Sequence, residues 1–143
     1  VTNSKGKFSG KAIRYLSHKN VKLNITAVYT TRQTIKIIRN LNKKTKSIIS
    51  IFAGRMSDVG KDPVPIFKKC VKLSKKYNKI QILWASTREP YNFIQANQID
   101  CDIITMPAGI IEKVSKFGKS FQSLTVDTVK KFLIDSEESN FKL

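Results

Sequence analysis

Residues 47–56 read SIISIFAGRM, an isoleucine-rich apolar run that ends in Gly54 and Arg55. Runs of β-branched and aromatic residues of this length are typical of buried strands. A guanidinium group at the end of such a strand is costly to bury unless it forms an ion pair or binds a ligand. The stretch therefore predicts a core strand that delivers a charged side chain to one edge of a sheet.

Strand-like and helix-like segments alternate on both sides of this stretch. Three further segments have the character of strands, namely residues 23–30 (LNITAVYT), 80–86 (IQILWAS) and 101–107 (CDIITMP). Helical patterns occupy residues 11–19, 31–44, 62–77, 88–98, 109–117 and 125–136. This alternation is the signature of a parallel sheet built from βα units, and such apolar strands indicate a sheet covered on both faces.

The length of the chain limits the architecture. The 143 residues, of which 41% are hydrophobic, are enough for a single domain, residues 1–143, with its own core. Four βα units cannot close an eight-stranded barrel, for which about 250 residues are typical. We therefore expect either a small open sheet or part of a barrel.

The net charge of +17 is the most conspicuous feature of the composition. The basic residues are spread over nearly every segment, and most fall where a solvated helix face is expected. We therefore predict a diffuse charge and no specific nucleic-acid partner.

No apolar stretch reaches about 18 residues, so no membrane partner is expected. Cys70 and Cys101 lie in apolar segments, which predicts reduced, mostly buried thiols in a cytoplasmic protein.

Several chemistries lack the residues that they need. The single histidine, His18, ends a lysine-rich helical segment, where contact with the helix dipole explains it. A Ser-His-Asp or Cys-His site is therefore not expected. Neither a CxxC pair nor an HExxH motif occurs, so we expect no metal site.

Polar side chains collect where the predicted strands end. In parallel α/β folds the chemistry gathers at the carboxyl ends of the strands. Taken singly, each polar residue could simply form a hydrogen bond with a neighbouring polar side chain. An arginine fork, however, matches an oxyanion with two hydrogen bonds, each worth about 1.5–3 kcal/mol. The candidates are Asn24, Thr26, Ser50, Phe52, Arg55, Ser86 and Arg88, of which Arg55, Ser86 and Arg88 predict a phosphate site.

These residues carry a resemblance to a known family. The segments LNITAVYT, SIFAGRM, WASTRE and CDIITMP resemble, in order and spacing, the last four strands of the transaldolase family, which includes fructose-6-phosphate aldolases. The likeness runs from Val1 to about Phe132. It implies a parallel (β/α)8 TIM-barrel fold, of which this chain supplies about the last four βα units and a C-terminal helix.

The resemblance also implies an activity. Family members are class I aldolases that use no cofactor. A barrel lysine forms a Schiff base with a ketose phosphate, and a dihydroxyacetone unit then passes to an aldehyde acceptor. The implied substrate is therefore a sugar phosphate, and the implied role is that of an enzyme of carbohydrate metabolism in the pentose phosphate pathway.

Carried over by residue, the resemblance assigns roles to the candidates. Thr26 would position the catalytic water, and Asn24 and Ser50 would hold the three-carbon unit. Phe52 stands where transaldolases tend to have phenylalanine and the fructose-6-phosphate aldolase branch has tyrosine, which favours transfer over cleavage. The implied phosphate ligands are again Arg55, Ser86 and Arg88.

One element of the family pattern is missing. The family's Schiff-base lysine lies on a strand immediately before the stretch that matches residues 1–3, so we expect this chain to lack it and to be inactive alone. Lys5, Lys7 and Lys11 are expected on the surface. The alternatives are aldolase-type cleavage of fructose 6-phosphate, or a non-catalytic module that binds phosphate or nucleic acid. Open strand edges favour pairing, so a homo-oligomer is expected.

Overall fold

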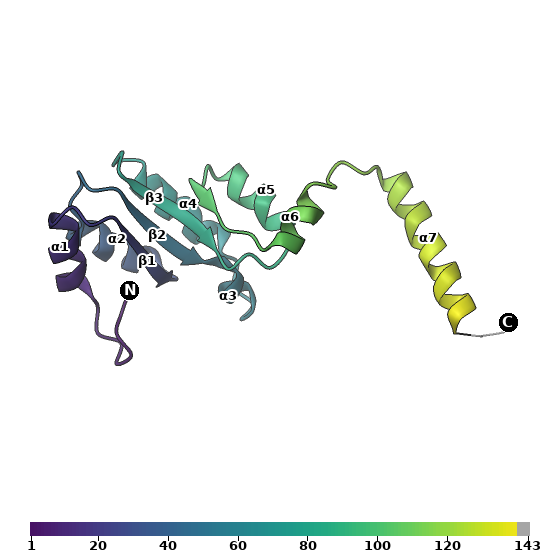
Figure 1. Ribbon diagram of the computed structural model, residues 1–143, viewed down its shortest axis with the longest axis horizontal. Helices are drawn as coiled ribbons and strands as arrows, with labels where there is room; N and C mark the ends of the chain where they lie inside the picture. Colours follow the sequence, from purple (N-terminus) through teal and green to yellow (C-terminus); the bar gives the residue numbers. More distant parts are fainter. Residues whose placement is uncertain (140–143) are drawn as a thin grey trace.

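The computed structural model describes residues 1–139, which form a parallel sheet with helices between its strands (Figure 1). Four strands lie side by side in chain order, and all three neighbouring pairs are parallel. The strands are β1 (Leu23–Val28), β2 (Ser47–Phe52), β3 (Ile80–Ala85) and β4 (Ile103–Ile104). The predicted α/β class and parallel order are confirmed.

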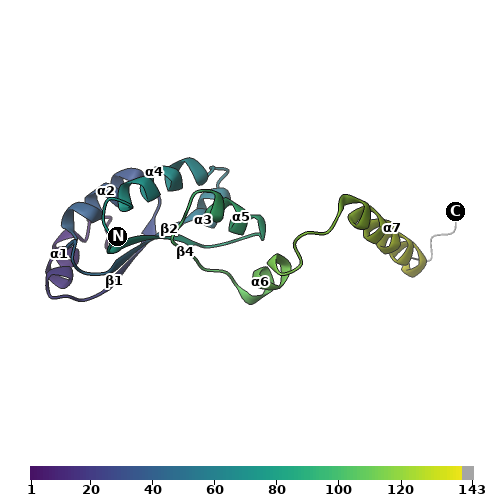
Figure 2. The ribbon, with the colours of Figure 1, turned by 90° about the horizontal axis from the view of Figure 1, so that it is seen from above.

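The helices before and between the strands cover only one face of this sheet (Figure 2). The helices are α1 (Gly10–His18), α2 (Thr31–Asn40), α3 (Ala53–Ser57), α4 (Val64–Ser74), α5 (Tyr91–Gln98), α6 (Ala108–Val114) and α7 (Phe121–Glu138). Of these, α1, α2, α4 and α5 lie on the same side of the strands in Figure 2. The expectation that both faces would be covered is therefore wrong for this chain.

The hydrophobic core lies between the sheet and these helices. Ile25, Ile49 and Ile82 are register partners on neighbouring strands, and all three are buried. Trp84 faces the same side and stacks on Phe67 of α4 with ring centroids 4.3 Å apart. Helix α4 buries the face that its spacing predicts, made of Phe67, Cys70, Val71 and Ser74. Removing this apolar surface from water is the main force that holds helices and sheet together.

The opposite face of the sheet carries no charged side chain within its strands. Successive strand residues point to opposite faces, so every second residue belongs to this side. The face consists of Asn24, Thr26, Ile48, Ser50, Phe52, Gln81, Leu83, Ala85 and Ile103. Asn24 and Thr26 are exposed there, whereas Ser50 is only 2% exposed. The polar candidates of β1 and β2 therefore share the helix-free face.

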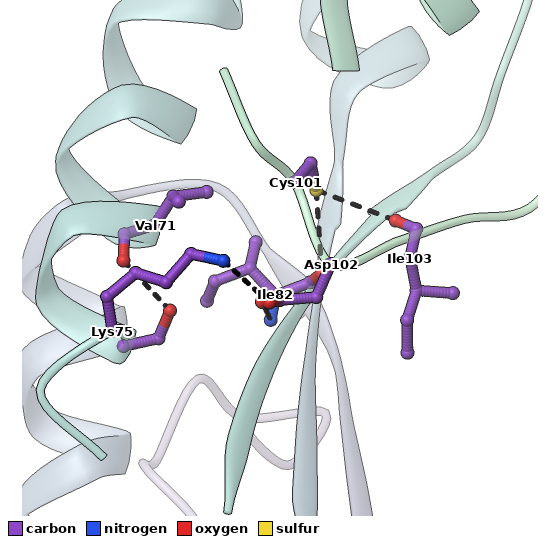
Figure 3. Close-up of polar contacts among 7 residues, drawn as sticks. Val71, Lys75, Ile82, Cys101, Asp102 and Ile103 are labelled. Atoms are coloured by element: carbon purple, nitrogen blue, oxygen red, sulfur yellow. Dashed lines mark hydrogen bonds and ion pairs between the residues drawn. The ribbon is translucent and has the colours of Figure 1, made fainter. Parts of the chain in front are cut away.

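Strand β4 is much shorter than the predicted strand at residues 101–107. Side chains take the place of its backbone pairs, as Figure 3 shows. The Asp102 carboxylate accepts a hydrogen bond of 2.8 Å from the Ile82 N–H, and the Cys101 thiol donates to the Ile82 carbonyl at 3.4 Å. Lys75 of α4 pairs with Asp102 at 3.2 Å. Because the side chains of Asp102 and Cys101 occupy the hydrogen-bonding groups of Ile82, the backbone pairing of β4 with β3 is confined to two residues of β4.

Both cysteines are free, as predicted. Cys70 is buried, and burial raises the pKa of its thiol. Burial is also the main cause that raises the pKa of Cys101 to about 11, with the neighbouring Asp102 charge acting in the same direction. Both thiols are thus held in the protonated form at neutral pH, in which they are poor nucleophiles.

Helix α7 begins at Phe121, four residues before the predicted start, because Ser120 caps it. The Ser120 hydroxyl accepts a 3.1 Å hydrogen bond from the Ser123 N–H. Figures 1 and 2 show α7 leading away from the sheet, and its Phe121 and Phe132 are 89% and 66% exposed. Across residues 1–139, no helix is long and apolar enough to cross a membrane.

Candidate functional site

The candidate site lies where β2 and β3 end side by side. Phe52, the last residue of β2, is the register partner of Ala85, the last residue of β3. The segments that follow these two residues are therefore neighbours. Arg55 follows β2 within the single-turn helix α3, which the sequence did not predict, and Ser86 and Arg88 follow β3.

Gly54 allows the two segments to pack in direct contact. A Cβ atom at this position would lie 1.9 Å from the Ser86 carbonyl oxygen and 2.6 Å from Cγ of Arg88. Only a residue without a side chain fits such a distance. The close approach places helix α3, with Arg55, directly against residues 86–88. The segments that carry the three predicted phosphate ligands thus lie against each other at one edge of the sheet.

Ser86 has an unusual backbone conformation at this edge. Its φ angle is 63°, in the left-handed region that residues with a side chain seldom adopt. Such a conformation costs on the order of 1–3 kcal/mol and persists where the surroundings fix it, often at functional sites. The next residue, Thr87, is buried and donates a 2.6 Å hydrogen bond to the Thr105 carbonyl. A surface hollow of about 370 Å³ adjoins this segment and is lined by Ser86, Thr87, Arg88, Thr105, Met106 and Pro107.

Arg88 is held at both ends of its side chain. Its backbone N–H donates to Oδ1 of Asn92 at 3.0 Å, and Asn92 is only 6% exposed. Its guanidinium Nη2 donates to Oδ2 of Asp58 at 2.7 Å, and this hydrogen bond and charge raise the pKa of Arg88. Sequence reasoning missed Asp58 and Asn92. For Asn92 the available signal was its spacing, because it follows Arg88 by four residues, whereas Asp58 pairs with a residue 30 positions away and has no local signal.

Arg55 lies beside an aromatic pair. Its guanidinium carbon is 5.7 Å from the centroid of the Phe52 ring, within the range of a cation–π contact. The Phe52 ring in turn meets Tyr29 edge to face, with centroids 6.0 Å apart. Within residues 1–139, no carboxylate lies within 4.0 Å of the Arg55 guanidinium. The side chain is exposed, so its charge is open to an external anion.

The other polar candidates, Asn24, Thr26 and Ser50, form a second group on the helix-free face. The Ser50 hydroxyl donates a 2.6 Å hydrogen bond to Oδ1 of Asn24. This bond uses the amide oxygen of Asn24 and does not use its N–H groups. Thr26 is exposed on the same face, two residues further along β1. The structure thus joins Asn24 and Ser50 directly and places Thr26 on the same strand face.

The fold is that of an α/β protein with a four-stranded parallel sheet, and comparison with known proteins identifies the family. The family model described as Transaldolase/Fructose-6-phosphate aldolase matches residues 7–143. A probable transaldolase of Caldicellulosiruptor saccharolyticus is 29% identical over 130 residues, which cover 90% of this chain and 56% of that protein. A probable transaldolase of Thermoplasma volcanium is 33% identical over 116 residues, which cover 80% of this chain and 50% of that protein.

The chain belongs to the transaldolase/fructose-6-phosphate aldolase family. It spans about half the length of the curated relatives that it matches. The family resemblance read from the strand segments is therefore confirmed. Four parallel strands in chain order, with helices on one face, are consistent with part of the TIM barrel that the family implies.

Proposed function

We propose that this chain supplies the phosphate-binding and donor-binding residues of a Schiff-base transaldolase that acts on sugar phosphates. The observation that carries the proposal is the close contact at Gly54, which packs the segment that carries Arg55 against the segment that carries Ser86 and Arg88. Family membership supports the substrate class. The reaction transfers a dihydroxyacetone unit from a ketose phosphate to an aldehyde acceptor.

The phosphate site anchors the substrate at a distance from the reacting carbons. Two guanidinium groups and a hydroxyl provide charge-assisted hydrogen bonds, which are about twice as strong as neutral ones. Binding energy from a non-reacting phosphate can hold the carbonyl in position for chemistry elsewhere on the sugar. In this role, Arg55 and Arg88 bind the phosphate oxygens and the Ser86 hydroxyl completes the ligand set.

The helix-free face binds the three-carbon unit. The 2.6 Å bond from Ser50 fixes Oδ1 of Asn24 and so directs the Asn24 amide N–H groups, which can donate to a substrate hydroxyl. Thr26 offers a hydroxyl on the same face for a catalytic water. We infer transfer rather than simple cleavage because Phe52 stands where transaldolases tend to have phenylalanine and the fructose-6-phosphate aldolase branch has tyrosine.

We place the Schiff-base lysine outside this chain. A lysine nucleophile requires a lowered pKa in a desolvated pocket that contains the substrate carbonyl. Lys5 and Lys7 lie in an exposed loop, and Lys11 lies on the exposed side of α1. Burial lowers the pKa of Lys43, but this residue precedes β2, at the edge of the sheet opposite to Arg55.

Trapping with borohydride tests this proposal. Reduction of the chain with fructose 6-phosphate should leave no covalent adduct, whereas addition of the amino-terminal half of a family barrel should give an adduct on its strand lysine. Mass spectrometry of tryptic peptides locates the modified residue. A stoichiometric adduct on any lysine of this chain would show that the nucleophile has been misplaced.

We also propose a cytoplasmic homo-oligomer. Two free thiols are typical of a reducing compartment. The outer strands β1 and β4 and the exposed apolar side chains of α7 offer surfaces for a second copy.

A further inference from the structure

Asp58 is a residue of the candidate site to which neither the family resemblance nor the sequence assigned a role. It follows the last turn of α3, and its backbone N–H donates to the Gly54 carbonyl at 2.8 Å. Asp58 is therefore fixed to the same short helix that carries Arg55. Its carboxylate reaches across to the segment after β3 and binds Arg88.

The contact with Asp58 restrains a part of Arg88 that nothing else in residues 1–139 hydrogen-bonds. The backbone of Arg88 is already held by the buried Asn92, which also accepts the Glu89 N–H at 3.3 Å. The side chain itself is 55% exposed, and an unrestrained arginine loses up to about 2 kcal/mol of rotamer entropy on being fixed. A partner that holds the guanidinium beforehand reduces the loss that accompanies ligand binding.

The geometry of the pair leaves Arg88 able to bind an anion. A guanidinium group has five N–H donors, and the bond to Asp58 uses one at Nη2. The remaining donors make no hydrogen bond within residues 1–139 and can bind an oxyanion, and Asp58 holds Arg88 against the short helix that carries Arg55. We propose that Asp58 is a positioning residue, which holds the Arg88 guanidinium toward Arg55 for phosphate binding. This inference rests on the phosphate-binding role proposed above.

A competing role for Asp58 has the opposite consequence. If the Asp58 carboxylate competed with phosphate for the same donors of Arg88, it would have to move away when phosphate binds. Removing Asp58 would then strengthen phosphate binding. If it orients Arg88, its removal weakens binding. The sign of the change on removing Asp58 therefore separates the two roles.

Calorimetric titration of the full chain with inorganic phosphate tests the inference. The Asp58→Ala variant should bind about threefold to tenfold more weakly, which corresponds to part of the rotamer entropy of one arginine. The Asp58→Asn variant keeps an oxygen acceptor, so it should stay within about threefold of the wild type. Such rescue is not expected if the negative charge alone mattered.

The Asp127→Ala variant is a matched control. Asp127 of α7 forms a similarly half-exposed ion pair with Lys119, away from the sheet, and its loss changes the net charge by the same amount. It should bind phosphate like the wild type. Melting temperatures of both alanine variants should lie close to that of the wild type, because exposed ion pairs are worth about 0–1 kcal/mol.

The outcomes distinguish failure of the inference from failure of the proposed function. Unchanged or tighter phosphate binding by Asp58→Ala, together with weakened binding by Arg88→Ala, overturns the positioning role alone. Unchanged binding by Arg88→Ala overturns the phosphate site itself, and the role of Asp58 with it. If Asp58→Ala fails to fold, tighter phosphate binding by Asp58→Asn would by itself refute the inference.

Discussion

The substitution Gly54→Ala perturbs the contact on which the candidate site depends. Ordinary van der Waals contacts of a Cβ atom begin at 3.4 Å, so a methyl group 1.9 Å from the Ser86 carbonyl oxygen is 1.5 Å too close. That oxygen belongs to the backbone and cannot rotate away as a side chain would. Helix α3 must therefore move away from the end of β3.

The expected cost follows from this overlap. Overpacking typically costs about 1–3 kcal/mol, and a rigid backbone neighbour favours the upper end of that range. The gain in helix propensity, about 1 kcal/mol for glycine to alanine, offsets only part of it. We therefore expect Gly54→Ala to lower the free energy of unfolding by about 1–2 kcal/mol. Because Arg55 moves with α3, phosphate binding should weaken as well.

Urea unfolding and phosphate titration measure the two effects. Gly109→Ala in α6 is the matched control, because no atom lies within 4 Å of its added Cβ and its helical position favours alanine. This control should be as stable as the wild type or more stable, with unchanged phosphate binding. If Gly54→Ala behaved like Gly109→Ala in both assays, the close contact would not form the site.

Two further predictions concern other parts of the sheet. The pKa of Cys101, raised to about 11 from 9.0, means that its protonated form stabilises the fold below pH 9 and that this contribution fades as the pH rises from 9 to 11. Between pH 8 and pH 10 the wild type should therefore lose about 1 kcal/mol more stability in urea than Cys101→Ser, and equal losses would contradict the assignment. Ser50→Ala removes the bond to Asn24 and should cost about 0.5–1.5 kcal/mol. It should also weaken binding of fructose 6-phosphate without affecting that of inorganic phosphate, and a parallel loss of both would place Ser50 in the phosphate site instead.

Much of the fold could be predicted from the sequence because its signals are local. Isoleucine-rich runs located β2 at residues 47–52, and helical spacing identified the buried face of α4. The strand-end candidates could also be located, because parallel strands bring their carboxyl ends to one edge. The family resemblance added the barrel context that a 143-residue chain does not itself reveal.

The features that the sequence did not reveal depend on contacts between distant residues. Helix α3 has five residues, too few to show a helical period, and its position depends on Gly54 meeting Ser86. The length of β4 depends on Asp102 replacing a backbone partner of Ile82. The pairing of Asp58 with Arg88 joins residues 30 positions apart, and no local pattern indicates it.

The central claim is that Arg55 and Arg88 bind the phosphate group of a sugar phosphate. Titration of the wild type and of the Arg88→Ala variant with fructose 6-phosphate and with fructose tests it most directly. We predict that Arg88→Ala weakens binding of the phosphorylated sugar more than tenfold, about 1.4 kcal/mol or more, because charge-assisted bonds to the phosphate are lost. Binding of fructose should be nearly unchanged. An equal loss for both sugars, or no loss for either, would contradict the account.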